Sequence, residues 1–256
     1  MIRRVVNIIP TYNEKDNISV LLSQLDRLAA AHPKYLWSAL VVDDTSPDGT
    51  AKLVRRFIPK HMTIKLLSGP KRGLGVAMVR GLKHALRTMS PDIIVTNEAD
   101  LAYDTNLIPR LLQKIESGWD VVLSTRHGPG AGVTGWTLNR RLNHFIANTV
   151  FAGWVAGINQ IKDHNGAFRA VRVKGVLDRI NWDAFPAAGF GFFNYWSFIL
   201  TTLTNRIYQL PITYNFRIRG ESKVSFNAKY FKTYIHDVFE YISLCLKIRI
   251  SHDRPY

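Results

Sequence analysis

Apolar runs alternate with stretches of helical periodicity along the first half of the chain. Four short segments rich in apolar residues, near residues 4–10, 40–42, 63–67 and 93–95, predict strands, and the run at 93–95 predicts a buried one. Each run is followed by a segment whose apolar residues recur three or four positions apart, which predicts a helix. Strands that alternate with helices in this way predict an α/β fold with a parallel sheet and right-handed crossovers.

The second half of the chain is less regular. Residues 120–124 predict a fifth strand, and the glycine-rich residues 128–136 predict a mobile loop that could close over a ligand. A helix is expected to begin near Arg140. The aromatic residues 185–204 are expected to be buried core, because this stretch is too polar and too broken to span a bilayer. Residues 208–215 predict a further strand.

The last apolar pattern predicts a helix over residues 229–250, with aromatic and aliphatic side chains on one broad face and cations at both ends. A helix of this kind either packs on its own domain or lies in a membrane interface. The pattern divides the chain into an α/β domain over residues 1–225 and a C-terminal amphipathic helix over residues 226–256.

Composition narrows the class of protein. The chain has 256 residues, 46% of them apolar, which is enough for a sizeable core. A single cysteine, Cys245, excludes an intramolecular disulfide framework, fits a reducing compartment and is expected in a core or an interface. Neither a signal-peptide pattern nor an apolar run of about 18 residues occurs, so we expect no export and no membrane span. The net charge of +15 favours nucleic acid, anionic lipid or a phosphorylated substrate as partner.

Carboxylates follow two of the predicted strands. Asp43 and Asp44 come after the second strand, and Glu98 and Asp100 come after the fourth. Open α/β sheets bind ligands at the carboxyl edge of their strands. Two carboxylates at that edge can turn toward one divalent cation, which would hold a pyrophosphate. The alternative is a solvated turn in which Asp104 or Thr105 caps the next helix.

The glycine-rich turn over residues 69–75 matches neither of two common phosphate-binding motifs. A dinucleotide fingerprint would need a third glycine where Met78 stands, and a P-loop would need Gly-Lys before Ser or Thr. Lys71 and Arg72 remain as cations at a helix N-terminus, where they could bind an anion or be plain surface charge.

Seven short motifs, in a fixed order, resemble the inverting family-2 glycosyltransferases of GT-A fold. They are PTYNE at 10–14, VVDDTSPDGT at 41–50, RGLGVA at 72–77, EADL at 98–101, the strand end at Arg126, the segment 136–140, and RGESK at 219–223. Within that family the chain is most similar to the polyprenol-phosphate (dolichol-phosphate) mannosyltransferases. The resemblance implies a Rossmann-like, mostly parallel central sheet flanked by helices.

The resemblance also implies a reaction: transfer of a hexose, mannose from GDP-mannose first of all, with inversion to a polyprenol (dolichol) monophosphate. A phosphate is already an anionic nucleophile at neutral pH, so its attack needs little or no general base. Positioning and charge stabilisation would then supply the rate. The leaving nucleoside diphosphate calls for cations, which fits a basic site and bound Mn²⁺ or Mg²⁺.

Residue roles follow from the same resemblance. The family's D-A-D metal motif falls on Glu98-Ala99-Asp100, so Glu98 and Asp100 would hold the metal, while Ala102 stands where the family often has a metal-binding Gln. The nucleotide sugar would be bound by Pro10, Tyr12, Glu14, Asp43, Asp44, Lys71, Glu98, Ala99, Asp100, Arg219 and Lys223. The acceptor's phosphate would be held by Arg126, Arg140 and His144. The residues expected to carry catalysis are Asp100, Arg126, Arg140, Arg217 and Lys223.

Two further implications concern the acceptor. Residues 163–169, DHNGAFR, fall where the family often has an acceptor loop, and a tight turn on Asn165-Gly166 is the alternative. A lipid acceptor implies peripheral contact with an anionic membrane at its cytoplasmic face, and a separate membrane subunit could complete the enzyme.

Three other interpretations stay open. A relative could use UDP-glucose or UDP-N-acetylglucosamine, on a lipid phosphate or a saccharide. A non-catalytic relative is suggested by Glu98 and Ala102. A nucleic-acid-binding α/β protein would explain the charge, but it predicts a basic stripe with interleaved aromatics, whereas these cations cluster at strand ends beside carboxylates. We therefore expect no nucleic-acid partner.

Overall fold

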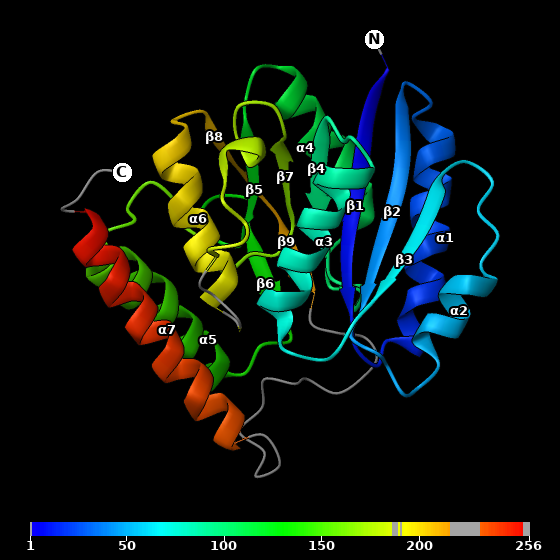
Figure 1. Ribbon diagram of the computed structural model, residues 1–256. Helices are drawn as coiled ribbons and strands as arrows, with labels where there is room; N and C mark the ends of the chain where they lie inside the picture. The colour runs from blue at the N-terminus through cyan, green and yellow to red at the C-terminus, as the bar shows by residue number, and fades with distance from the viewer. Residues whose placement is uncertain (1, 186–188, 190, 216–230, 253–256) are drawn as a thin grey trace.

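A seven-stranded sheet flanked by helices forms the centre of the molecule (Figure 1). The computed structural model describes residues 2–185, 189, 191–215 and 231–252. Across the sheet the strands are β3 (Thr63–Ser68), β2 (Tyr35–Asp43), β1 (Arg3–Thr11), β4 (Ile93–Thr96), β7 (Arg169–Arg172), β5 (Val121–Thr125) and β8 (Ile207–Pro211). Neighbouring strands are parallel except around β7, which runs antiparallel to β4 and β5. The predicted mostly parallel α/β sheet is confirmed.

A helix follows each of the first four strands, as the apolar periodicity predicts. These are α1 (Lys15–Ala31), α2 (Thr50–Arg56), α3 (Leu74–Thr88) and α4 (Ile108–Glu116), the last preceded by the 3₁₀ turn η1 (Thr105–Leu107). Helix α1 buries Ile18, Leu21 and Leu25 completely. Helix α3 approaches the sheet closely at Gly81, where a Cβ atom would lie 2.7 Å from Cγ2 of Val42. The close packing of α3 on the sheet therefore requires glycine at position 81, which has no side chain.

Residues 208–215, predicted as one strand, form two strands in different sheets. After β8 the chain crosses to β9 (Thr213–Asn215), which pairs in parallel with β6 (Gly132–Thr134). Pro211 has no N–H to continue the ladder with β5, so the main sheet ends there. Ile212 joins the two sheets: its N–H donates to the Thr125 carbonyl and its carbonyl accepts from Gly132, both at 3.0 Å. The glycine-rich segment predicted as a loop thus contains a strand.

Four helical elements in the second half of the chain pack on one another. Helix α5 (Leu138–Phe145) continues into the π-helix η2 (Ile146–Val155), and α7 (Phe231–His252) packs against η2 and α6 (Gly191–Leu203). Figure 1 shows α7 and α5 side by side at one flank of the molecule. One side of α7 is buried through Tyr241, Leu244, Cys245 and Ile248, which places the thiol in the core as expected. Among the described residues, no helix is long and apolar enough to cross a membrane.

Candidate active site

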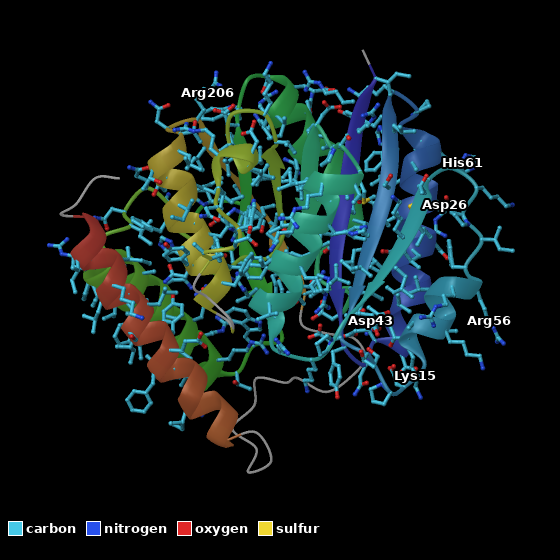
Figure 2. All side chains as sticks on the ribbon, viewed as in Figure 1. Lys15, Asp26, Asp43, Arg56, His61 and Arg206 are labelled. Carbon is cyan, nitrogen blue, oxygen red and sulfur yellow. The ribbon has the colours of Figure 1, made fainter. Side chains whose placement is uncertain are left out.

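The PTYNE and VVDDTSPDGT segments are joined by hydrogen bonds at the carboxyl edge of β1 and β2. Three consecutive backbone N–H groups, those of Asn13, Glu14 and Lys15, donate to Ser46, Thr50 and Asp48 at 2.9–3.0 Å. Figure 2 shows Lys15 and Asp43 at this same end of the sheet. The two motifs therefore build one rigid wall, with Pro10 at the end of β1 beside Val42.

Both predicted aspartates in this wall are buried and engaged. Asp43 is fully buried, and its oxygens accept from the Thr11 hydroxyl at 3.0 Å and from the backbone N–H and the hydroxyl of Ser46 at 2.9 and 2.6 Å. Asp44 forms an ion pair with Arg80 at 2.7 Å. Burial raises the pKa of Asp44, and the hydrogen bond from Arg80 only partly opposes this. Both carboxylates are thus fixed in place before any ligand arrives.

Tyr12 and Lys71, two predicted nucleotide contacts from separate loops, meet in the structure. The Lys71 ammonium lies 3.8 Å from the centroid of the Tyr12 ring. This cation–π contact brings a positive charge to the carboxyl edge, where an anionic ligand would need it.

The acidic loop after β4 has a constrained backbone. Asp100 is 2% exposed, and its Oδ1 accepts from the backbone N–H of Ala102 at 3.1 Å. Leu101 between them adopts a left-handed φ of 61°, which is costly for a branched side chain. Glu98 is half-buried and Ala99 is buried. The loop is therefore held in one shape that presents two carboxylates.

Arg126, which follows β5, is held by Asp163, a residue of the segment 163–169 that was not itself among the predicted site residues. Its Nε and Nη2 each donate to Asp163 at 2.6 Å, and its backbone N–H donates to the same side chain at 3.0 Å. Burial alone would raise the pKa of Asp163, but the charge and hydrogen bonds of Arg126 lower it well below its usual value. Nε and Nη2 of Arg126 are thus both bonded to Asp163, and its Nη1 takes no part in these bonds.

The two arginines predicted to bind the acceptor both contact the ring of Trp136. The guanidinium carbon of Arg126 lies 5.4 Å from its centroid and that of Arg140 lies 5.0 Å away. Arg126 also lies 5.4 Å from the centroid of the Tyr214 ring. Burial, followed by the charges of Glu98 and Asp100, raises the pKa of Tyr214. The acidic loop and the arginine pair therefore face the same tyrosine.

His144 contacts the same Trp136 ring, with centroids 5.0 Å apart, and it pairs with His127. The two Nε2 atoms are 3.0 Å apart, and the rings are stacked with centroids 5.0 Å apart. Ligand atoms of His127, His144 and Asp163 all lie within 4.8 Å of one another, close enough for a metal ion on distance alone. Burial, followed by the charge of Arg126, lowers the pKa of His144 to about 3, so this ring is neutral at pH 7.

The loop over residues 163–169 is organised by a buried arginine. Arg169 is fully buried, its Nε donates to the Gly166 carbonyl at 3.1 Å, and its guanidinium lies 4.9 Å from the rings of Phe193 and Trp196. Burial lowers the pKa of Arg169 to about 9. Through this anchor the loop presents Asp163 to Arg126.

Some predicted residues cannot be placed, and some important ones were missed. Arg217, Arg219 and Lys223 lie outside the described residues. The predicted site residues did not include Asp163, His127 or Asn148. For Asp163 the reason is that a single sequence does not distinguish a tight turn from a turn whose carboxylate faces an arginine. Trp136 belongs to the motif segment 136–140, but only the structure shows its contact with both arginines.

Two comparisons with known proteins bear on the family. The family model described as Glycosyl transferase family 2 matches residues 7–185. The chain is 33% identical to the undecaprenyl-phosphate mannosyltransferase of Micrococcus luteus over 87% of this chain and 88% of that protein. It is 30% identical to the dolichol-phosphate mannosyltransferase of Pyrococcus furiosus over 86% of this chain, which spans 59% of that relative's length.

Solved structures share the fold. A glucosyl-3-phosphoglycerate synthase from Mycobacterium tuberculosis, crystallised with Mn²⁺, UDP and phosphoglyceric acid, matches with a TM-score of 0.66 at 17% identity, over 95% of this chain and 78% of that one. At this identity the likeness shows the fold alone, which is the GT-A fold. The family model covers well over half of the 256 residues. The chain therefore belongs to the glycosyltransferases of family 2.

Proposed function

We propose that this protein transfers mannose from GDP-mannose to a polyprenol monophosphate with inversion at the sugar. One observation carries the proposal: Arg126 and Arg140 both contact the ring of Trp136. Arg126 also contacts Tyr214, whose pKa is raised by burial and then by the charges of Glu98 and Asp100. A phosphate held by these arginines would lie next to the donor's sugar. The names of the Micrococcus luteus and Pyrococcus furiosus relatives support both the sugar and the class of acceptor.

The donor side is assigned to the wall built by the first two motifs and to the acidic loop. Tyr12 and Lys71 would contact the nucleotide, and Glu14 and Asp43 would accept from its ribose and base. Glu98 and Asp100 fit a hard divalent cation because carboxylate oxygens are the preferred ligands of Mg²⁺ and Mn²⁺. When bound, such an ion would neutralise charge on the departing diphosphate.

The acceptor side needs no general base. A phosphate monoester is anionic at neutral pH and attacks directly, so the work of the protein is to position it. Nη1 of Arg126 and the guanidinium of Arg140 would bind its oxygens as charge-assisted donors, with His144 beside them. Arg217, Arg219 and Lys223 are proposed to bind the leaving pyrophosphate.

A donor screen tests this function. Purified protein is incubated with a short polyprenyl phosphate and, in turn, GDP-mannose, UDP-glucose or UDP-N-acetylglucosamine, with and without Mn²⁺, and the lipid product is measured. We expect mannose transfer from GDP-mannose with the β-anomeric product of an inverting reaction. A UDP-sugar as the only substrate would replace the proposed donor, and the absence of turnover with every donor would support a non-catalytic relative.

Contact with a membrane is supported by exposed apolar side chains on three helical elements, α5, η2 and α7. We call these side chains the helix face. Its members are all at least half exposed: Leu138, Leu142, Phe145, Trp154, Phe239, Leu246 and Ile250. Exposed apolar surfaces of this extent are typical of interaction sites, and the exposed cations Lys247 and Arg249 suit anionic headgroups. We propose that this face lies on the cytoplasmic side of the membrane that holds the lipid acceptor.

A liposome experiment tests the helix face. The double variant Phe145→Ser and Phe239→Ser should lose most co-sedimentation with anionic liposomes and most activity on long polyprenyl phosphates, because it removes apolar area from both α5 and α7. Activity on a short, water-soluble analogue should remain. Ile58→Ser is the matched control, since Ile58 is 85% exposed but lies outside the helix face. Equal sedimentation of all three proteins at low salt would contradict membrane docking.

A further inference from the structure

Arg80 connects helix α3 to the wall formed by the first two motifs, although it lies outside all seven motifs. Its Nη2 donates to Oδ1 of Asp44 at 2.7 Å, and the two side chains are 21% and 8% exposed. The next residue, Gly81, allows this reach, because it lets α3 approach the sheet closely at Val42. The ion pair is therefore placed by the packing of the helix on the sheet.

The same guanidinium covers the backbone of Gly69, the first residue of the loop between β3 and α3. We call residues 69–73 the glycine loop. A Cβ atom on Gly69 would lie 2.5 Å from Nη1, 2.6 Å from Cζ and 2.9 Å from Nε of Arg80, closer than side-chain atoms approach one another. An alanine at position 69 would therefore displace the guanidinium, so Arg80 needs glycine there to keep its place on Asp44.

Gly69 is also bonded to both neighbours of Asp44. Its N–H donates to the Asp43 carbonyl at 3.0 Å, and its carbonyl accepts from the Thr45 hydroxyl at 2.8 Å. Thr45 has a left-handed φ of 52°, which is costly for a β-branched residue and persists only where the surroundings hold it. The end of β2 and the start of the glycine loop are thus fixed against each other, with Arg80 against both.

The glycine loop carries Lys71 to the donor side of the site. Lys71 lies two residues after Gly69, and its ammonium contacts the ring of Tyr12. Burial raises the pKa of Asp44, while Arg80 and, more weakly, Lys71 lower it. Arg80 from the helix and Lys71 from the loop therefore both compensate one buried carboxylate, which would otherwise repel an anionic ligand at this edge of the sheet.

We propose that Arg80 is a positioning residue for the nucleotide: its guanidinium holds Asp44 and the glycine loop together, so that Lys71 stays where the nucleotide binds. The proposal rests on the donor side of the proposed function. Arg80 acts through Asp44 and the loop, without touching the nucleotide. By compensating the charge of Asp44 it also lets a diphosphate approach.

Nitrogen relaxation in NMR tests the loop without any ligand. In the wild-type protein the backbone order parameters of Lys71 and Arg72 should be about 0.85, and in Arg80→Gln they should fall below about 0.6. Arg87→Gln is the matched control, because Arg87 lies on the same helix with a side chain that is 67% exposed. Strand β5 should give equal values in all three proteins. A glycine loop that stays rigid in Arg80→Gln would overturn the proposal.

Calorimetry with GDP and with UDP measures the consequence for the donor site. Arg80→Gln should raise the Kd of whichever nucleoside diphosphate binds the wild-type protein by about 10-fold, as expected when a hydrogen bond between charged groups is lost. The acceptor KM should not change. Arg80→Lys should recover part of the loss, since lysine keeps the charge opposite Asp44 but has no planar group to cover Gly69. Arg87→Gln should bind like the wild-type protein.

Gly69→Ala tests the same contact without changing any charge. Its Cβ atom should displace the guanidinium of Arg80, so nucleotide affinity should fall as in Arg80→Gln. The double variant should bind no more weakly than Arg80→Gln alone, because the contact between the two positions is already lost. Losses that add in the double variant would overturn the link between Gly69 and Arg80.

These outcomes are distinct from a failure of the proposed function. That failure is seen in the wild-type protein, as absent turnover with every donor. The present inference fails if the wild-type protein and Arg80→Gln bind the nucleoside diphosphate with equal Kd. A merely structural role for Arg80 would lower the free energy of unfolding and leave this Kd unchanged.

Discussion

Replacing Asp100 with Asn should abolish metal-dependent binding of the nucleotide sugar and with it all measurable transfer. Asp100 is 2% exposed on a backbone that turns at the left-handed Leu101, and its Oδ1 accepts from the backbone N–H of Ala102, so its carboxylate is held in one position. The amide keeps the size and the bond from Ala102 but loses the negative charge that a divalent cation requires. Isothermal calorimetry with GDP-mannose, in Mn²⁺ and in EDTA, measures the effect directly.

Glu98→Gln is the companion variant to Asp100→Asn. Glu98 is half-buried and longer by one methylene than the family's residue, so we expect a weaker metal site and a partial loss. Equal nucleotide affinity of the wild-type protein in Mn²⁺ and in EDTA would remove the metal from the donor site. The circular dichroism spectrum of both variants should match that of the wild-type protein, which excludes misfolding as the cause.

Asp163→Ala should lower the free energy of unfolding by about 3–5 kcal/mol, the usual cost of leaving one partner of a buried ion pair uncompensated. Side chains of Asp163 and Arg126 are only 1% and 9% exposed, and the carboxylate receives three hydrogen bonds from Arg126. Acceptor binding should fall as well, because the freed guanidinium no longer lies on Trp136. Urea denaturation and the acceptor KM are the two measurements.

The control for Asp163→Ala is Asp183→Ala. Asp183 also pairs with a cation, Lys83, but its side chain is 66% exposed, so removal should leave stability within error of the wild-type protein. The buried pair of Asp163 and Arg126 also makes the stability of the protein depend on pH. Folding lowers the pKa of Asp163, so its stabilisation is fully present above the ordinary carboxylate pKa and is lost as the pH falls toward the folded value. Equal stability of both variants would contradict the buried pair.

The regular part of the fold could be predicted because one physical signal dominates it. Strands β1, β2 and β4 and the helices α1, α3 and α4 bury apolar residues whose spacing is visible in the chain, as Ile18, Leu21 and Leu25 of α1 illustrate. Strand β7 carried no such signal. Arg169 and Arg172 occupy both ends of this short strand, and only its position between β4 and β5 makes it a strand. Tertiary pairing there overrides local pattern.

The candidate site could be predicted where its residues lie within a recognisable motif, and not where they depend on long-range contacts. Asp43, Asp100 and Arg126 lie at strand ends, and strand ends are identified by the same periodicity that gives the sheet. Asp163 is hydrogen-bonded to Arg126, which lies 37 positions away in the sequence, and Asn148 is hydrogen-bonded to His164, which lies 16 positions away. Contacts of this kind depend on how loops pack, which a single sequence does not encode in any local pattern.

The bridge at Ile212 has a consequence for local stability. Because this residue bonds both to Thr125 at the end of the main sheet and to Gly132 in β6, the glycine-rich segment cannot detach without also releasing the start of β9. Opening would therefore be a cooperative event of one small unit rather than the fraying of a free loop. The amide hydrogens of Gly132 and Ile212 should then exchange with solvent at matching rates, slower than those of ordinary glycine-rich loops.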